Sequence, residues 1–169
     1  GSPIKQGSLM QRPDLAKTLS LIAENGVKTF YEGEIAEKFV LAMQLNEGLI
    51  TDADLKNYKS RFSAPIGINY RGQKVFTHGP PSGGGIVLLT ALNVLENFDL
   101  KKHGSNSSTT YHLLAEALRR GHNNRSHHVG DPSFYKTPIE NFLSSERTKQ
   151  LARNINFKKA TASSAIKPL

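Results

Sequence analysis

The chain has 169 residues, a formal net charge of +8, and neither cysteine nor tryptophan. The absence of cysteine excludes disulfides, a thiol nucleophile and a cysteine zinc site. No run approaches the roughly 18 apolar residues that a membrane helix needs. The 22 basic residues lie singly or in pairs such as Lys101-Lys102 and Arg119-Arg120. This dispersion is typical of solvated helix faces, so we expect no nucleic-acid and no membrane partner.

The first 60 residues predict three helices. Pro13-Asp14 begins a helix whose apolar residues recur at helical spacing up to Asn25-Gly26. Thr51 has the character of a cap for a short third helix. The second helix ends at Gly48, and its inward face is expected at Ile35, Phe39, Val40 and Met43.

The hydrophobic period then changes from helical to alternating. Ile66, Ile68 and Tyr70 alternate with small or polar residues, and Arg71-Gly72 supplies a two-residue turn. This pattern predicts a β-hairpin near 66–78. Because an isolated hairpin is marginal in water, we expect it to pack on the helices or to join strands outside this sequence.

A rigid and then flexible corner follows, made of Pro80, Pro81, Ser82, Gly83 and Gly84. A phosphate-binding loop needs Lys and then Ser or Thr after its last glycine, but Ile86-Val87 stand there. A nucleophile elbow needs glycine two residues before its serine, where Pro80 stands. Anion binding by the amides of the next helix remains an alternative. A close backbone crossing, where side chains would clash, is the favoured interpretation.

Two helices are predicted after the corner. The run Ile86–Leu95 is apolar nearly all round, which is typical of a buried helix. A polar loop at 104–108 leads to the next helix. Its inward face is expected at Tyr111, Leu114, Ala115 and Leu118.

One more helix and a tail complete the prediction. Thr137 as cap, Pro138 in the first turn and Glu140 three residues after Thr137 predict a helix that runs to about Arg153. Residues 158–169 have no periodicity, so they are expected to form an extended or disordered tail.

Four histidines invite a metal-site hypothesis: His112, His122, His127 and His128. Helical metal sites favour a spacing of three or four residues, whereas His122 and His127 are five apart. Surface or hydrogen-bonded histidines are therefore expected, and no metal ligand is assigned.

Arg125 and Asp131 flank the end of the helix that carries Glu116. An Arg and an Asp around a turn usually tie a loop down, so we interpret Arg125 and Asp131 as a structural ion pair, with a site role as the alternative. The residues show no Ser/His/Asp set, no paired carboxylates and no dinucleotide fingerprint, and by themselves they predict no reaction.

Taken in order, segments of the chain resemble the γ-glutamyltranspeptidase family over about residues 3–168. The matching segments are Gln11–Leu19, Phe30-Tyr31-x-Gly33-x-Ile35-Ala36, Gly48–Thr51, Asp54-Leu55-x-x-Tyr58, Tyr70-Arg71-Gly72, Pro80–Gly84, Leu92–Glu96, Ala115-Glu116-Ala117 and Arg125-x-x-x-x-Gly130-Asp131-Pro132. The family usually has a second serine where Gly83 stands. This departure puts the local corner geometry in doubt.

The resemblance implies an N-terminal-nucleophile hydrolase made as one precursor. Such a precursor cuts itself before a Thr into a large and a small subunit, and the freed Thr attacks the γ-glutamyl amide of glutathione or related compounds. The acyl group then passes to water or an amino acid, and no cofactor is needed. The parent protein would be periplasmic or secreted, although residues 1–5 have no apolar stretch of signal-peptide type.

By this resemblance the chain is the later part of a large subunit, with an α+β, mainly α fold. Residues 1–157 would be its helical segment, and the hairpin would belong to a layered αββα sandwich. The tail 158–169 would lead toward the self-cleavage site, with the Thr shortly after Leu169. The implied partners are the small subunit and the rest of the large subunit.

No catalytic or substrate-binding residue is therefore assigned to this chain. By the resemblance, the family's nucleophile stands in a Thr-Thr-His context. Thr109-Thr110-Tyr111 is the nearest match to that context in this chain, but it stands in the wrong place. Two alternatives stay open. One is a fragment of a related enzyme, such as a poly-γ-glutamate depolymerase or a cephalosporin acylase. The other is a non-enzymatic basic binding module, which salt-sensitive nucleic-acid binding would favour.

Overall fold

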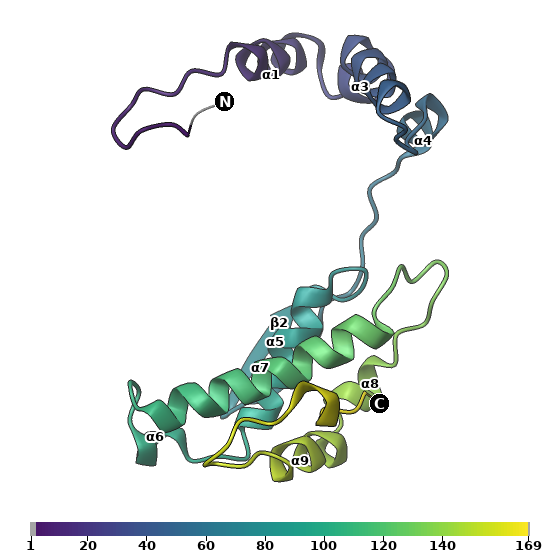
Figure 1. The fold of residues 1–169 in the computed structure, drawn as a ribbon. Helices are drawn as coiled ribbons and strands as arrows, with labels where there is room; N and C mark the ends of the chain where they lie inside the picture. The colour runs from purple at the N-terminus through teal and green to yellow at the C-terminus, as the bar shows by residue number, and fades with distance from the viewer. Residues whose placement is uncertain (1–2, 169) are drawn as a thin grey trace. The chain divides into compact units, whose positions relative to one another are not determined.

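The computed structural model describes residues 3–168 and divides the chain into two compact units, Gly1–Arg61 and Phe62–Leu169. The described residues are mainly helical, with one antiparallel two-stranded sheet (Figure 1). This confirms the predicted mainly α fold with a single hairpin. The segment 1–157, expected as one helical segment, is therefore divided between these two units. None of the helices in residues 3–168 is long and apolar enough to cross a membrane.

The first unit holds four helices: α1 (Pro13–Asn25), α2 (Lys28–Glu32), α3 (Glu34–Leu45) and α4 (Asp52–Asn57). The three predicted helices are confirmed, and α2 is an additional short helix. Thr51 begins α4 through a capping box, because its N–H donates to Asp54 Oδ2 (2.8 Å) and its Oγ1 accepts from the Asp54 N–H (3.3 Å). Tyr31 and Tyr58 stack with ring centroids 5.5 Å apart, which ties α2 to the end of α4.

This first unit has little interior of its own. Ala36 is its one buried hydrophobic residue within the described range. The apolar stripe of α1 is open, since Leu19 is 57% exposed. Amphipathic helices gain most of their stability from packing of the apolar face. These helices therefore present apolar surface that is suited to a further protein partner.

Basic residues on these helices pair with acids one turn away. The pairs are Lys28–Glu32, Lys38–Glu34 and Lys56–Asp52. Such pairs are typical of solvated helix faces, in agreement with the interpretation of the dispersed charge.

The second unit begins with the predicted hairpin, β1 (Ile66–Tyr70) and β2 (Gln73–Thr77). Ile68 lies opposite Val75, and the turn residues Arg71 and Gly72 have φ values of 50° and 81°. Positive φ at both turn positions is the geometry that suits the twist of a two-residue hairpin. Alternate residues of β1 are half-buried because that face packs on α5 (Gly83–Leu95).

Helices α5 and α7 (Ser108–His128) run side by side and form the centre of this unit (Figure 1). A Cβ added at Gly121 would lie 2.7 Å from the carbonyl oxygen of Val87, so glycine lets the two backbones meet. The remaining helices are α6 (Leu100–His103), α8 (Ile139–Leu143), α9 (Ser145–Arg153) and a 3-10 turn, η1 (Ser163–Ala165). One cluster of the core consists of Ala91, Val94, Leu95, Leu113, Ala117, Leu151, Ala152 and Ile155, and Ile86, Val87, Leu89 and Phe142 are also buried.

The predicted inward face of α7 is wrong. Tyr111, Leu114 and Leu118 are all exposed, whereas the face that packs inward carries polar residues. The buried residues of α7 are Leu113, Glu116, Ala117, Arg120, Gly121 and Asn124. Polar side chains can occupy an inward face when they satisfy one another, and Glu116 and Arg120 do so.

The single helix predicted from Thr137 to Arg153 is also wrong. The helix is interrupted at Ser144, whose backbone is extended (φ −64°, ψ 142°). Ser144 ends α8 and caps α9, because its Oγ accepts a hydrogen bond from the Arg147 N–H. The expected Thr137 cap is not made, because the buried Thr137 hydroxyl has no hydrogen-bond partner. The break separates Phe142 on α8 from Leu151 on α9, and both side chains are buried.

The corner between β2 and α5 contains a close backbone approach. A Cβ added at Gly85 would lie 2.1 Å from the His78 carbonyl oxygen, and Gly85 is buried. Neighbouring Gly84 is exposed, and a Cβ there would meet no atom within 4 Å. Both residues lie in the first turn of α5.

These two glycines allow a matched prediction. Gly85→Ala should lower the free energy of unfolding by about 1–3 kcal/mol. The new Cβ would clash with the His78 carbonyl oxygen, and only a shift of the backbone can relieve that clash. Gly84→Ala should be neutral or stabilising by up to ~1 kcal/mol, since alanine favours helix. Urea unfolding followed by circular dichroism measures both. Equal effects of the two substitutions would contradict the close approach.

Candidate functional site

The glycine-rich corner lies at the start of α5. The Pro80–Pro81 peptide is cis, and the Ser82 N–H donates to the Gly79 carbonyl oxygen (3.2 Å). Ser82 stands at the cap position without a side-chain hydrogen bond to the helix. A Cβ added at Gly83 would lie 2.6 Å from Arg125 Nε, so glycine leaves room here for the Arg125 side chain. The corner therefore contacts Arg125 near the end of α7, the separate candidate for an ion pair with Asp131.

Arg125 and Asp131 lie on either side of the end of α7. The Arg125 carbonyl oxygen accepts from the Val129 N–H (3.2 Å), and Asp131 Oδ1 accepts from the Ser133 N–H (2.8 Å). The Asp131 carbonyl oxygen accepts from the Tyr135 N–H (2.9 Å). Asp131 therefore organises the turn after α7, and its ion pair with Arg125 stays a prediction.

The histidines are engaged in separate contacts. His112 Nε2 donates to the Asn156 carbonyl oxygen (2.8 Å), and His127 Nδ1 donates to that of Asn123 (2.9 Å). His128 Nδ1 lies 3.4 Å from the Tyr135 hydroxyl. Within residues 3–168, no group of three or more His, Asp or Glu side chains is placed to hold a metal ion.

A buried polar network lies on α7. Glu116 and Arg120 are each 2% exposed, and Arg120 Nη1 donates to Glu116 Oε2 (2.6 Å). Arg120 also donates to the carbonyl oxygens of Leu151 (3.0 Å) and Asn154 (3.0 Å). The guanidinium therefore joins α7 to the end of α9.

The tail closes this network from the other side. The Thr161 hydroxyl donates to Glu116 Oε2 (2.5 Å), and the Thr161 N–H donates to Glu116 Oε1 (3.1 Å). Arg119 adds a hydrogen bond from its Nη1 to Glu116 Oε1 (2.7 Å). One carboxylate thus binds two residues of its own helix and one residue 45 positions later.

Opposing influences act on the Glu116 carboxyl. Burial, the largest single influence, raises its pKa. Hydrogen bonds from Thr161 and Arg120, together with the positive charge of Arg120, act in the other direction and lower the pKa to about 2. The carboxylate is therefore ionised in the folded protein at neutral pH.

Sequence reasoning placed Glu116 on this helix but missed Arg120 and Thr161. The four-residue spacing of Glu116 and Arg120 was a usable signal, because such pairs face each other on a helix. No pattern in the sequence predicted the contact of Thr161 with Glu116, because Thr161 lies in the stretch that was expected to be extended or disordered.

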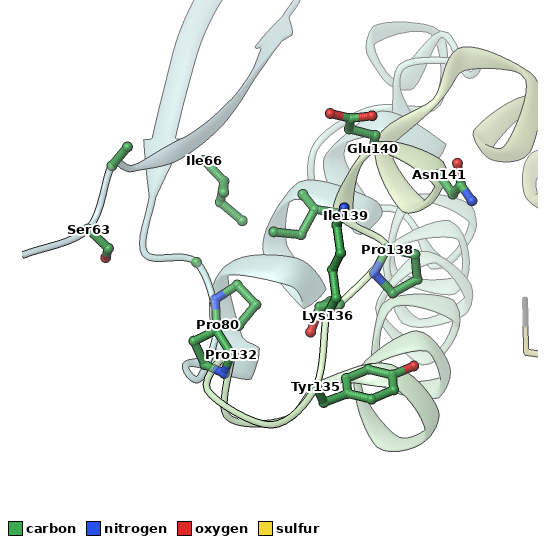
Figure 2. A pocket seen from close by; sticks show the side chains of 13 residues that line it. Ser63, Ile66, Pro80, Pro132, Tyr135, Lys136, Pro138, Ile139, Glu140 and Asn141 are labelled. Carbon is green, nitrogen blue, oxygen red and sulfur yellow. The ribbon is translucent and has the colours of Figure 1, made fainter.

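An open groove of about 760 Å³ lies at another edge of the second unit (Figure 2). Its apolar lining includes Ile66, Pro80, Pro132, Pro138 and Ile139. Lys136, Glu140 and the unpaired Thr137 hydroxyl also lie along it. No hydrogen-bonded pair of nucleophile and base is seen among its described side chains. An apolar lining of this kind suits contact with another polypeptide surface.

Thr110, in the segment Thr109-Thr110-Tyr111, has a structural role. The Thr110 hydroxyl donates to the Gly104 carbonyl oxygen (2.7 Å), and the Thr110 N–H donates to Ser107 Oγ (3.1 Å). These contacts form the cap of α7.

Known proteins match nearly the whole length of this chain. The family described as Gamma-glutamyltranspeptidase matches residues 1–168. The glutathione hydrolase proenzyme of Escherichia coli (strain K12) is 44% identical over 168 residues, which cover 99% of this chain and 29% of that protein. The chain thus spans less than a third of this relative.

Solved structures agree with this result. The γ-glutamyltranspeptidase of Helicobacter pylori matches with a TM-score of 0.83 and 37% identity, over 97% of this chain and 49% of that chain. The cephalosporin acylase of Bacillus halodurans matches with a TM-score of 0.73 and 31% identity, over 83% of this chain and 26% of that chain. The same helical arrangement therefore occurs in proteins named for different reactions.

The Glu116 network predicts an acid-sensitive step in stability. Because the folded pKa is below the ordinary value of 4.5, the stabilisation is present above about pH 5 and is lost as pH falls toward 2. The full loss is roughly 3 kcal/mol, converted from the shift in pKa. Urea unfolding between pH 7 and pH 3 should show most of this loss in the unmodified chain.

Two variants test the assignment to Glu116. Glu116→Gln should be less stable at pH 7 and should lose much of the pH dependence. Glu140→Gln, which removes an exposed carboxyl, should leave the pH dependence nearly unchanged. An unaltered pH slope in Glu116→Gln would contradict the network.

Proposed function

Because this chain belongs to the γ-glutamyltranspeptidase family, we propose that it forms the later part of the large subunit of a self-cleaving γ-glutamyltranspeptidase precursor. The observation that carries the proposal is the family match over residues 1–168, combined with coverage of only 29% of the E. coli proenzyme. The proposed activity of the parent protein is γ-glutamyl transfer from glutathione to water or to an amino acid.

The proposed chemistry lies outside this chain. Self-cleavage adds water across the peptide bond before a Thr, so that one product ends in a carboxylate and the other begins with the Thr amine. The Thr hydroxyl oxygen then attacks the γ-glutamyl carbonyl carbon, the amide C–N bond breaks, and the leaving amine takes a proton. Water or an amino acid next displaces the Thr oxygen. We propose that this requires no metal or organic cofactor.

The role of this chain in that scheme is that of a scaffold. Its first unit has open apolar helix faces, and its hairpin has only two strands, so both suit contact with the small subunit and the rest of the large subunit. A periplasmic or secreted location of the parent protein is part of the same proposal and rests on the family resemblance.

A related acylase is the second candidate. It is supported by the match to the B. halodurans cephalosporin acylase, which covers 83% of this chain against 97% for the H. pylori transpeptidase. The greater coverage and higher identity favour the transpeptidase. A basic binding module is less well supported, because three exposed lysines of the first unit, Lys28, Lys38 and Lys56, pair with acids.

The proposal predicts that the purified 169-residue chain does not release glutamate from glutathione. The reason is that it has no Thr in the required context. A longer product of the same gene that includes the small-subunit region is the positive control, and it should yield two fragments and hydrolyse glutathione. Turnover by the 169-residue chain alone, or an uncut and inactive longer product, would contradict the proposal.

A further inference from the structure

We infer that Glu116 and Thr161 form a latch that fixes the tail, residues 158–168, on α7, and that they act as positioning residues for self-cleavage of the precursor. The second part rests on the proposed function, whereas the latch itself does not. Neither residue is a catalytic residue, since both act through the path of the chain.

Successive residues of the tail contact successive turns of α7. Thr161 contacts Glu116 and Ser163 Oγ accepts from Arg119 Nη2 (3.0 Å), so later tail residues meet later residues of the helix. Further along, the Ile166 carbonyl oxygen accepts from Asn123 Nδ2 (3.1 Å). The tail therefore runs in the same direction as α7 and lies along it (Figure 1).

Polar contacts, rather than apolar burial, hold this segment. Ile166 is its one large aliphatic residue, and it is only half-buried. The remaining residues are small, charged or polar, so little apolar surface is available to fix the path. At the far end, Arg147 Nη2 donates to the Lys167 carbonyl oxygen (3.3 Å), but this contact is exposed.

The contact to Glu116 differs from the others in the number of its donors and in the burial of its acceptor. It joins two donors of one residue to a buried, ionised carboxylate, and hydrogen bonds to a charged group are about twice as strong as neutral ones. A shift of the tail by one residue would bring Ala160 or Ala162 to the carboxylate, and neither has a hydroxyl to donate. Thr161 therefore sets the register of the whole tail.

The latch has a consequence for the precursor. If the chain continues from the tail toward the scissile peptide bond, a fixed Thr161 restricts where that bond can lie. Restricting a reacting group to a productive position is a large source of rate in intramolecular reactions. Release of the latch should therefore slow self-cleavage while the core of the second unit stays folded.

Substitutions at Thr161 test the latch while Arg120 keeps its ion pair with Glu116. Thr161→Val also removes the longer hydrogen bond from Arg120 Nη2 to Thr161 Oγ1 (3.3 Å), but the same Nη2 still donates to the Asn154 carbonyl oxygen (3.0 Å). Thr161→Val keeps the shape of the side chain and removes the hydroxyl donor, and Thr161→Ser restores that donor. Ser164→Ala is the control for a change in an exposed part of the tail. Hydrogen exchange by mass spectrometry on the 169-residue chain should show tail amides exchanging at least tenfold faster in Thr161→Val, with α5 unchanged. Thr161→Ser and Ser164→Ala should exchange within about threefold of the unmodified chain.

The same variants in the longer precursor test positioning. Thr161→Val should cleave itself at least tenfold more slowly, and Thr161→Ser should recover most of the rate. Unchanged tail exchange in Thr161→Val would overturn the latch. Faster exchange with an unchanged cleavage rate would overturn the positioning role.

A third result separates this inference from the proposed function. An unmodified precursor that never cuts itself would overturn both the proposed function and the positioning role. The exchange experiment would then still decide the latch, because it uses the 169-residue chain alone.

Discussion

Glu116 and Arg120 are buried together on α7, and each neutralises the charge of the other. Burying either alone would cost several kcal/mol, because an ion that leaves water needs a compensating partner. The pair is held further by carbonyl oxygens from the end of α9 and by Thr161 of the tail. Helix α7 therefore meets two segments that lie 31 to 45 residues later, the end of α9 and the tail, at one charged pair. Their relative placement is specific, since a polar network tolerates only the arrangement that satisfies every donor.

Apolar packing supplies the rest of the second unit. Helix α5 is apolar nearly all round and is covered by the hairpin, α7, α8 and α9. Gly85 and Gly121 let it approach the backbone on two sides. The network on α7 lies beside this core, where α7 contacts the end of α9 and the tail. This arrangement explains why α7 carries charged residues on its inward face.

The first unit differs from the second because its helices bury little of their apolar surface. Its helices have clear start and stop signals and form largely as those signals predict, but their apolar faces stay open. Such faces cannot support much stability without a partner. A chain that covers 29% of the E. coli relative is expected to leave surfaces of this kind uncovered. The open groove beside Pro80 and Ile139 is a further surface of the same type.

Local signals in the sequence determined most elements and the family. The Thr51 cap, the Arg71-Gly72 turn and the apolar run at 86–95 each act within a few residues, so the sequence predicted them. Tertiary structure decided the inward face of α7, the break at Ser144 and the path of the tail. These depend on partners distant in sequence: Glu116 finds Thr161 45 residues later, and Thr137 is buried rather than used as a cap. Local periodicity cannot reveal that a charged residue is buried, because its neutralising partners are chosen only when the chain folds.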